Sequence, residues 1–116
     1  MDDDTPLRDE PVLGIAAVGD AIVVRLGGDL DLYNVDVVRA GLARAIDRSP
    51  ARLVVDLSSV EFLDSTALGA LVDAHRKQPG GLRIAGPKDA IRRALRVSGI
   101  DRHLTVFDTV EDALTP

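Results

Sequence analysis

The feature that most limits how this chain can fold is a short run at residues 52–57, which reads Arg-Leu-Val-Val-Asp-Leu. Most of its side chains are aliphatic, and they follow one another with little polar alternation. A strand with one buried face alternates apolar and polar side chains, whereas a strand covered on both faces is almost continuously hydrophobic. Strands of the second kind occur mainly in parallel sheets that carry helices. The run therefore predicts an α/β domain with a mostly parallel sheet.

The flanking segments extend this prediction to the whole chain. Apolar segments at residues 12–18 and 21–26 are separated by a Gly-Asp turn, which predicts an opening β-hairpin, and Gly27-Gly28 is expected to end its second strand. Residues 58–63 are expected to connect the buried strand to the next helix. Strands and helices then alternate, which favours right-handed crossovers and a mixed, mostly parallel sheet covered by helices. The further strands are expected at residues 82–85 and 104–107, and the helices over residues 35–46, 64–77, 87–98 and from 109 onward.

Composition narrows the class of protein. A chain of 116 residues suits one domain, expected over residues 12–116, because residues 1–11 are acidic and proline-containing and predict a disordered tail. The net charge of -5 repels phosphate backbones, so nucleic acid is not an expected partner. The absence of cysteine excludes disulfides and thiol catalysis. The acidic start is unlike a signal peptide, and no apolar run approaches the ~20 residues of a membrane span, so a soluble cytoplasmic protein without direct membrane contact is expected.

The segment richest in chemistry is residues 64–69, Asp-Ser-Thr-Ala-Leu-Gly, at the expected start of a helix. Aspartate, serine and threonine are all preferred N-cap residues, so capping alone explains any one of them. A helix needs only one cap, however, and three candidates stand in a row. If Asp64 is the cap, the hydroxyls of Ser65 and Thr66 are spare and lie near the positive end of the helix dipole. A phosphate there would meet free N–H donors and a favourable field.

The sequence around this helix start resembles a known protein family. Residues 54–69 look like the signature of the STAS family, the sulfate-transporter and anti-sigma-factor-antagonist domain, whose apolar strand ends in Asp-Leu and leads to Asp-Ser-Ser/Thr-Gly/Ala-Leu-Gly. Residues 28–31, Gly-Asp-Leu-Asp, match the family's Gly-Glu-Leu-Asp. Residues 84–86 and 98–100 match its later strand and helix end. The likeness covers about residues 12–114.

Two positions depart from the commoner family pattern. Ala67 stands where many members have glycine, and Asp29 stands where glutamate is commoner. Both changes are mild, because alanine suits a helix and aspartate keeps the charge. The resemblance thus implies a STAS-like fold for residues 12–116.

The resemblance also implies a role and a site. In the antagonists of this family, the unphosphorylated protein binds an anti-sigma factor that is also a serine kinase, which frees a sigma factor in a bacterial stress response. Phosphorylation of the serine directly after the motif aspartate breaks that complex, and a serine phosphatase restores it. Carried over, the phosphorylated serine is Ser65 and Thr66 is a weaker acceptor, while Asp31, Asp64 and Leu68 join them at the partner surface. Such a protein is a binding module and a kinase substrate, with no catalytic residue and no cofactor.

Other readings remain open. The same domain could serve as a peripheral STAS subunit of a membrane complex that transports a lipid or an anion, or as a small nucleotide-binding protein or enzyme. Asp29, Asp31, Asp56 and Asp64 are expected at one end of the sheet, where a divalent cation would suit them, but loop aspartates more often make turns and caps, so no metal site is expected. A serine hydrolase is disfavoured because Ser65 lacks the Gly-x-Ser-x-Gly context of a nucleophile elbow.

Overall fold

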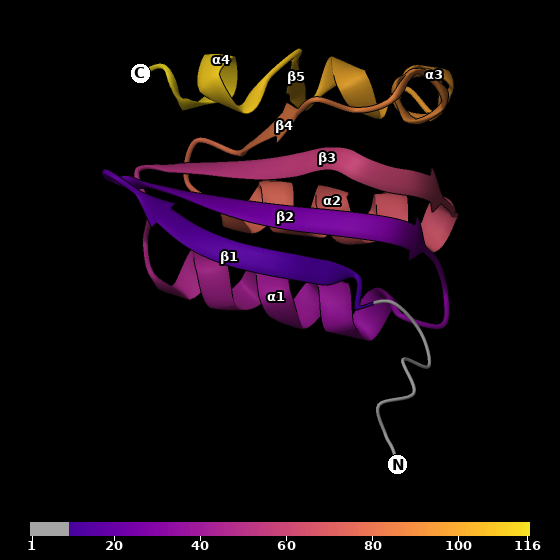
Figure 1. Ribbon diagram of the computed structural model, residues 1–116, viewed down its shortest axis with the longest axis horizontal. Helices are drawn as coiled ribbons and strands as arrows, with labels where there is room; N and C mark the ends of the chain where they lie inside the picture. Colours follow the sequence, from indigo (N-terminus) through magenta and orange to yellow (C-terminus); the bar gives the residue numbers. More distant parts are fainter. Residues whose placement is uncertain (1–9) are drawn as a thin grey trace.

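The computed structural model describes residues 10–116. Within them, five strands form one sheet in the order β1-β2-β3-β4-β5 (Figure 1). Strand β1 is antiparallel to β2, and β2 to β5 run parallel to one another, which confirms the opening hairpin and the mixed, mostly parallel sheet. The strands are β1 (Val12–Val18), β2 (Ala21–Leu30), β3 (Arg52–Leu63), β4 (Leu82–Ala85) and β5 (Thr105–Phe107).

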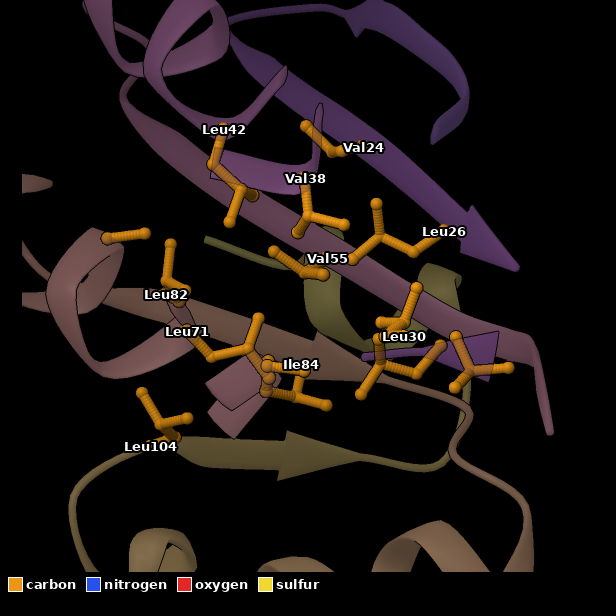
Figure 2. Packing of buried hydrophobic residues seen from close by; sticks show 14 of the residues in the cluster. Val24, Leu26, Leu30, Val38, Leu42, Val55, Leu71, Leu82, Ile84 and Leu104 are labelled. Carbon is orange, nitrogen blue, oxygen red and sulfur yellow. The ribbon is translucent and has the colours of Figure 1, made fainter. Parts of the chain in front are cut away.

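The helices cover the two faces of the sheet unequally. The main core joins side chains of the sheet to those of three helices and a 3₁₀ turn on one face. Figure 2 labels part of this core, including Val38, Leu42 and Leu71 from helices and Val55 and Ile84 from the sheet. On the other face, a smaller cluster packs the last helix against β3, β4 and β5. The helices of the main face are α1 (Val35–Asp47), α2 (Ser65–Lys77) and α3 (Asp89–Val97), followed by η1 (Ile100–Arg102), and the opposite face carries α4 (Val110–Leu114).

The run that most constrained the fold behaves as expected. Leu53, Val55 and Leu57 enter the main core, and Val54 enters the smaller cluster on the opposite face. All four are fully buried. Strand β3 is therefore buried on both faces along this stretch, and its hydrophobic continuity has the predicted cause.

Two predicted boundaries inside the sheet are wrong. Strand β2 does not end at Gly27-Gly28 but continues to Leu30, and residues 58–63 are not a connection but the second half of β3. The pairing of these halves is irregular, with register shifts between Arg25 and Gly27 and again between Gly28 and Asp29. Gly28 has φ +74°, a conformation that glycine adopts without steric cost. The glycines thus permit bulges in a strand that continues beyond them.

The observed ends of the other segments differ from the predicted ends by smaller amounts. The predicted disordered tail falls mainly on residues 1–9, which lie outside the described residues, but Pro11 is buried and its carbonyl accepts a hydrogen bond from the Gly27 N–H at 3.0 Å. The third helix begins at Asp89, after the expected Pro87, because Lys88 is its N-cap residue. Gly99, with φ +80°, follows that helix as predicted, and Thr109 caps α4 by accepting from the Asp112 N–H.

None of the helices found in residues 10–116 is both long and apolar enough to cross a membrane.

Candidate functional site

Asp64 organises the site with both oxygens of its carboxylate. Its Oδ1 accepts a hydrogen bond from the Ala67 N–H at 3.0 Å, which makes it the N-cap of α2. Its Oδ2 accepts from the Leu32 N–H at 3.1 Å, and its own N–H donates to the Leu30 carbonyl at 3.1 Å. The expected capping role of Asp64 is thus present, together with a second bond that the sequence did not indicate. One side chain therefore ties the start of α2 to the loop between β2 and α1.

That loop carries Asp31 in a turn of its own. The Asp31 Oδ1 accepts from the Tyr33 N–H at 2.9 Å, and the Asp31 N–H donates to Asn34 Oδ1 at 2.9 Å. Asn34 also donates through Nδ2 to the Asp29 carbonyl at 2.7 Å. These are side-chain contacts to nearby backbone of the kind that fix tight turns. Asp31 is consequently held one residue away from the direct contact between Leu32 and the N-cap of α2.

Ser65 is the first residue of α2 and is exposed, whereas Thr66 is half-buried. In the part of the chain that the structure describes, neither hydroxyl makes a hydrogen bond, since Asp64 already supplies the cap. The first turn of α2 contains no acidic residue. The positive end of the helix dipole therefore lies beside an accessible hydroxyl, and the N-cap carboxylate of Asp64 is the acidic group that faces it.

Large apolar side chains border this end of the sheet. Leu32 is 65% exposed, Tyr33 83% and Phe62 52%, although residues of this kind are usually buried. The first two belong to the loop that Asp64 holds, and Phe62 lies at the end of β3, where it pairs with Asp29 of β2. Exposed apolar groups gathered beside polar ones are typical of protein–protein contact surfaces. Sequence reasoning did not single out these three residues.

Leu68 occupies a different position from the other predicted site residues. It lies one turn into α2, is half-buried and packs against the main core. Its backbone N–H donates to the Asp64 carbonyl at 3.0 Å. Leu68 thus supports the helix start from within the fold and exposes only part of its side chain.

The aspartates considered above as cation ligands, of which Asp29 and Asp56 lie in strands and Asp64 is a helix cap, form no cation site within residues 10–116. The Asp56 side chain bonds to its own strand, where its Oδ1 accepts a hydrogen bond from the Ser58 N–H at 2.9 Å. The Asp64 carboxylate accepts hydrogen bonds from two backbone amides, as described above. Across residues 10–116, no group of three or more histidine, aspartate or glutamate side chains is placed to hold a metal ion. The carboxylates of this end therefore shape loops and a helix start.

Comparison with known proteins gives this geometry a family. The family model of the STAS domain matches residues 14–113. The chain belongs to the STAS domain family. The resemblance to the STAS family is thereby confirmed, and the five-stranded sheet agrees with the STAS-like fold that it implied.

Several relatives of this STAS domain are named anti-sigma factor antagonists. It is 32% identical to the anti-sigma-F factor antagonist RsfB of Mycobacterium tuberculosis over 95 residues, which cover 80% of this chain and 78% of RsfB. It is 31% identical to the anti-sigma F factor antagonist of Paenibacillus polymyxa over 98 residues, 81% of this chain and 84% of the relative. Among solved structures, an anti-sigma factor antagonist from Mycobacterium paratuberculosis superimposes with a TM-score of 0.81 at 28% identity, covering 86% of this chain and 87% of the other.

Proposed function

We propose that this STAS domain is an anti-sigma factor antagonist whose binding is controlled by phosphorylation of Ser65. In its unphosphorylated form it binds an anti-sigma factor that has serine kinase activity, and a sigma factor is released. Phosphorylation of Ser65 ends that complex, and a serine phosphatase restores it. The observation that carries the proposal is the exposed hydroxyl of Ser65, which makes no hydrogen bond within residues 10–116, at a helix start already capped by Asp64. The names of the relatives support the partner class.

The surroundings of Ser65 explain why a phosphate would alter binding without unfolding the domain. A phosphate adds about -1.5 to -2 charges at neutral pH. At the N-terminus of α2 that charge meets the favourable end of the helix dipole, which offsets its repulsion from the neighbouring Asp64 carboxylate. A partner that covers the exposed Leu32, Tyr33 and Phe62 would have to remove water from the same phosphate, and burying an unpaired charge is costly. The modification therefore acts on the interface.

We further propose that the protein is a regulatory module and a kinase substrate and does not perform catalysis itself. The hydroxyl of Ser65 has no base within hydrogen-bonding distance in the described residues, so the kinase must supply the groups that activate it. Asp64 is occupied by the amides of Ala67 and Leu32. Asp31, Asp64 and Thr66 then border the contact surface, and Ser65 is the group that is modified.

The direct test is to incubate the protein with candidate anti-sigma kinases and ATP and to map the phosphate by mass spectrometry. Phosphate is expected on Ser65 in the wild-type protein and in Thr66→Ala, and none in Ser65→Ala. Thr66→Ala is the matched control, because it removes the neighbouring hydroxyl and leaves the cap unchanged. Phosphate that persists in Ser65→Ala and disappears in Thr66→Ala would move the site to the neighbour and refute the assignment.

Binding measurements separate the switch from the modification. Ser65→Ala should bind the anti-sigma factor as the unmodified protein does, whereas Ser65→Asp should bind poorly because it places a carboxylate at the same position. Equal affinity of the two variants would refute the switch mechanism even if Ser65 is the phosphorylated residue.

A further inference from the structure

A cavity beside the C-terminal half of α2, away from the helix start that Asp64 caps, has no role in the proposed switch. It has a volume of about 410 Å³ and lies between the second half of α2 and the turn formed by η1. Its apolar lining comes from Val72, Ile100 and Leu104, and the last two are buried. A second hollow of about 260 Å³ shares Val72 and Ile100 and extends along α2 to Leu68. The combined size and the apolar lining fit a small organic ligand.

The polar side chains around the larger cavity are all basic. They are His75 and Arg76 from α2 and Arg102 and His103 from η1 and the residue after it. Guanidinium groups are always charged and donate without accepting. His75 is fixed by the bond that its Nδ1 accepts from the Leu82 N–H at 2.9 Å. An imidazole that accepts at Nδ1 carries its hydrogen at Nε2, so His75 also offers a donor.

No ion pair within residues 10–116 ties up these donors, although the charge of Arg76 does act on nearby Asp73. No aspartate or glutamate lines the cavity. Elsewhere in residues 10–116 several cations do meet a carboxylate, as Arg39 meets Asp73 and Arg92 meets Asp108, but neither Arg76 nor Arg102 has an ion-pair partner among the described residues. Asp73, the carboxylate nearest in sequence to Arg76, is already held by Arg39 at 2.7 Å. In a chain of net charge -5, a site with basic groups alone stands out.

We propose that this cavity binds a small amphiphilic anion, with its phosphate or carboxylate head between Arg76 and Arg102 and its apolar body against Ile100 and Leu104. The planar guanidinium groups match the geometry of both head groups, and charge-assisted hydrogen bonds are stronger than neutral ones. The apolar lining adds affinity by removing hydrocarbon surface from water. The proposal does not depend on Ser65, because the groups that form this site lie beyond the first turn of α2.

The test uses phenyl phosphate as the probe, with inorganic phosphate and phenol as its separate halves, followed by ¹H–¹⁵N NMR titration of the full chain. Phenyl phosphate should shift the amides of residues 72–76 and 100–104 in a saturable way and bind more tightly than either half. Arg76→Gln and Arg102→Gln should each weaken binding about tenfold, as expected for the loss of a charge-assisted contact. Arg44→Gln is the matched control, since it removes the same charge from an exposed position on α1 outside the cavity.

Three results would overturn the proposal. The first is phenol binding as tightly as phenyl phosphate, which would remove the role of the anion. The second is an unchanged affinity in the double variant of Arg76 and Arg102. The third is equal weakening by Arg44→Gln, which would indicate general charge attraction. All the substituted arginines are exposed, so the variants are expected to fold, and an unchanged urea midpoint verifies this.

Discussion

Replacing Asp64 should damage two parts of the structure at once, because its two carboxylate oxygens bind amides from different elements. Asp64→Ala removes the N-cap bond to the Ala67 N–H and the loop bond to the Leu32 N–H. Loss of an aspartate N-cap costs about 1 kcal/mol. Loss of a further hydrogen bond at a partly exposed amide costs about 1 kcal/mol. The free energy of unfolding should therefore fall by about 2 kcal/mol.

Asp64→Asn separates the two contributions. Asparagine caps helices as well as aspartate does, so its Oδ1 can still accept from the Ala67 N–H. Its Nδ2 would replace the oxygen that faces the Leu32 N–H, and two donors cannot bond each other. This variant should lose about 1 kcal/mol. Thr109→Ala, which removes a cap with a single bond to the Asp112 N–H, provides a comparison and should also lose about 1 kcal/mol.

Urea unfolding followed by circular dichroism measures these losses. With an m-value of about 1.5 kcal/mol per molar, the midpoint should fall by about 1.3 M in Asp64→Ala and by about 0.7 M in Asp64→Asn. Amide hydrogen exchange adds a local readout, since the Leu32 amide should exchange faster in both variants and the Ala67 amide only in Asp64→Ala. Equal losses in the two variants, or an Ala67 amide that is unprotected in both, would refute the division of roles between the two oxygens.

Two further predictions concern other parts of the molecule. In Gly81→Ala the new Cβ would lie 2.3 Å from Cε1 of His75 at a φ of +80°, so the free energy of unfolding should fall by about 3 kcal/mol. Gly80→Ala is the control, because its φ is +84° but no atom lies within 4 Å of the new Cβ, and it should lower the free energy of unfolding by about 1 kcal/mol. Similar urea midpoints for the two variants would contradict this prediction. The hydrogen bond from Arg39 holds the pKa of Asp73 below its ordinary value. The stabilisation of the fold by this pair is therefore present above the ordinary aspartate pKa and is lost as the pH falls through the pKa of Asp73 in the folded protein. Arg39→Gln should raise the pKa of Asp73 in an NMR titration, and an unchanged titration would disprove the coupling.

The elements that could be predicted are those whose signal is local. The hydrophobic run at residues 52–57 revealed a strand buried on both faces, because burial acts on each residue of the run directly. The cap of α2 by Asp64 was also predicted, since its bond to the Ala67 N–H spans three residues. Short-range hydrogen bonds of this kind are encoded by residue type and spacing.

The elements that were missed depend on contacts between distant segments. Strand β2 continues past Gly27-Gly28 because residues 59–63 of β3 provide a partner, and neither segment alone reveals that pairing. The bond between Asp64 and the Leu32 N–H joins residues 32 positions apart. The basic cavity likewise brings Arg76 and Arg102 together from different elements. The sequence could place Ser65 at a helix start, but only the fold shows that the exposed apolar residues lie at the same end of the sheet.

The central claim is that one phosphate on Ser65 decides whether this STAS domain binds its anti-sigma factor. The most direct measurement is the affinity of that partner, by isothermal titration calorimetry, for the wild-type protein before and after stoichiometric phosphorylation at Ser65. Phosphorylation is expected to weaken binding by about tenfold or more, a change of about 1.4 kcal/mol, while the circular dichroism spectrum stays the same. Equal affinity of the two forms would contradict it.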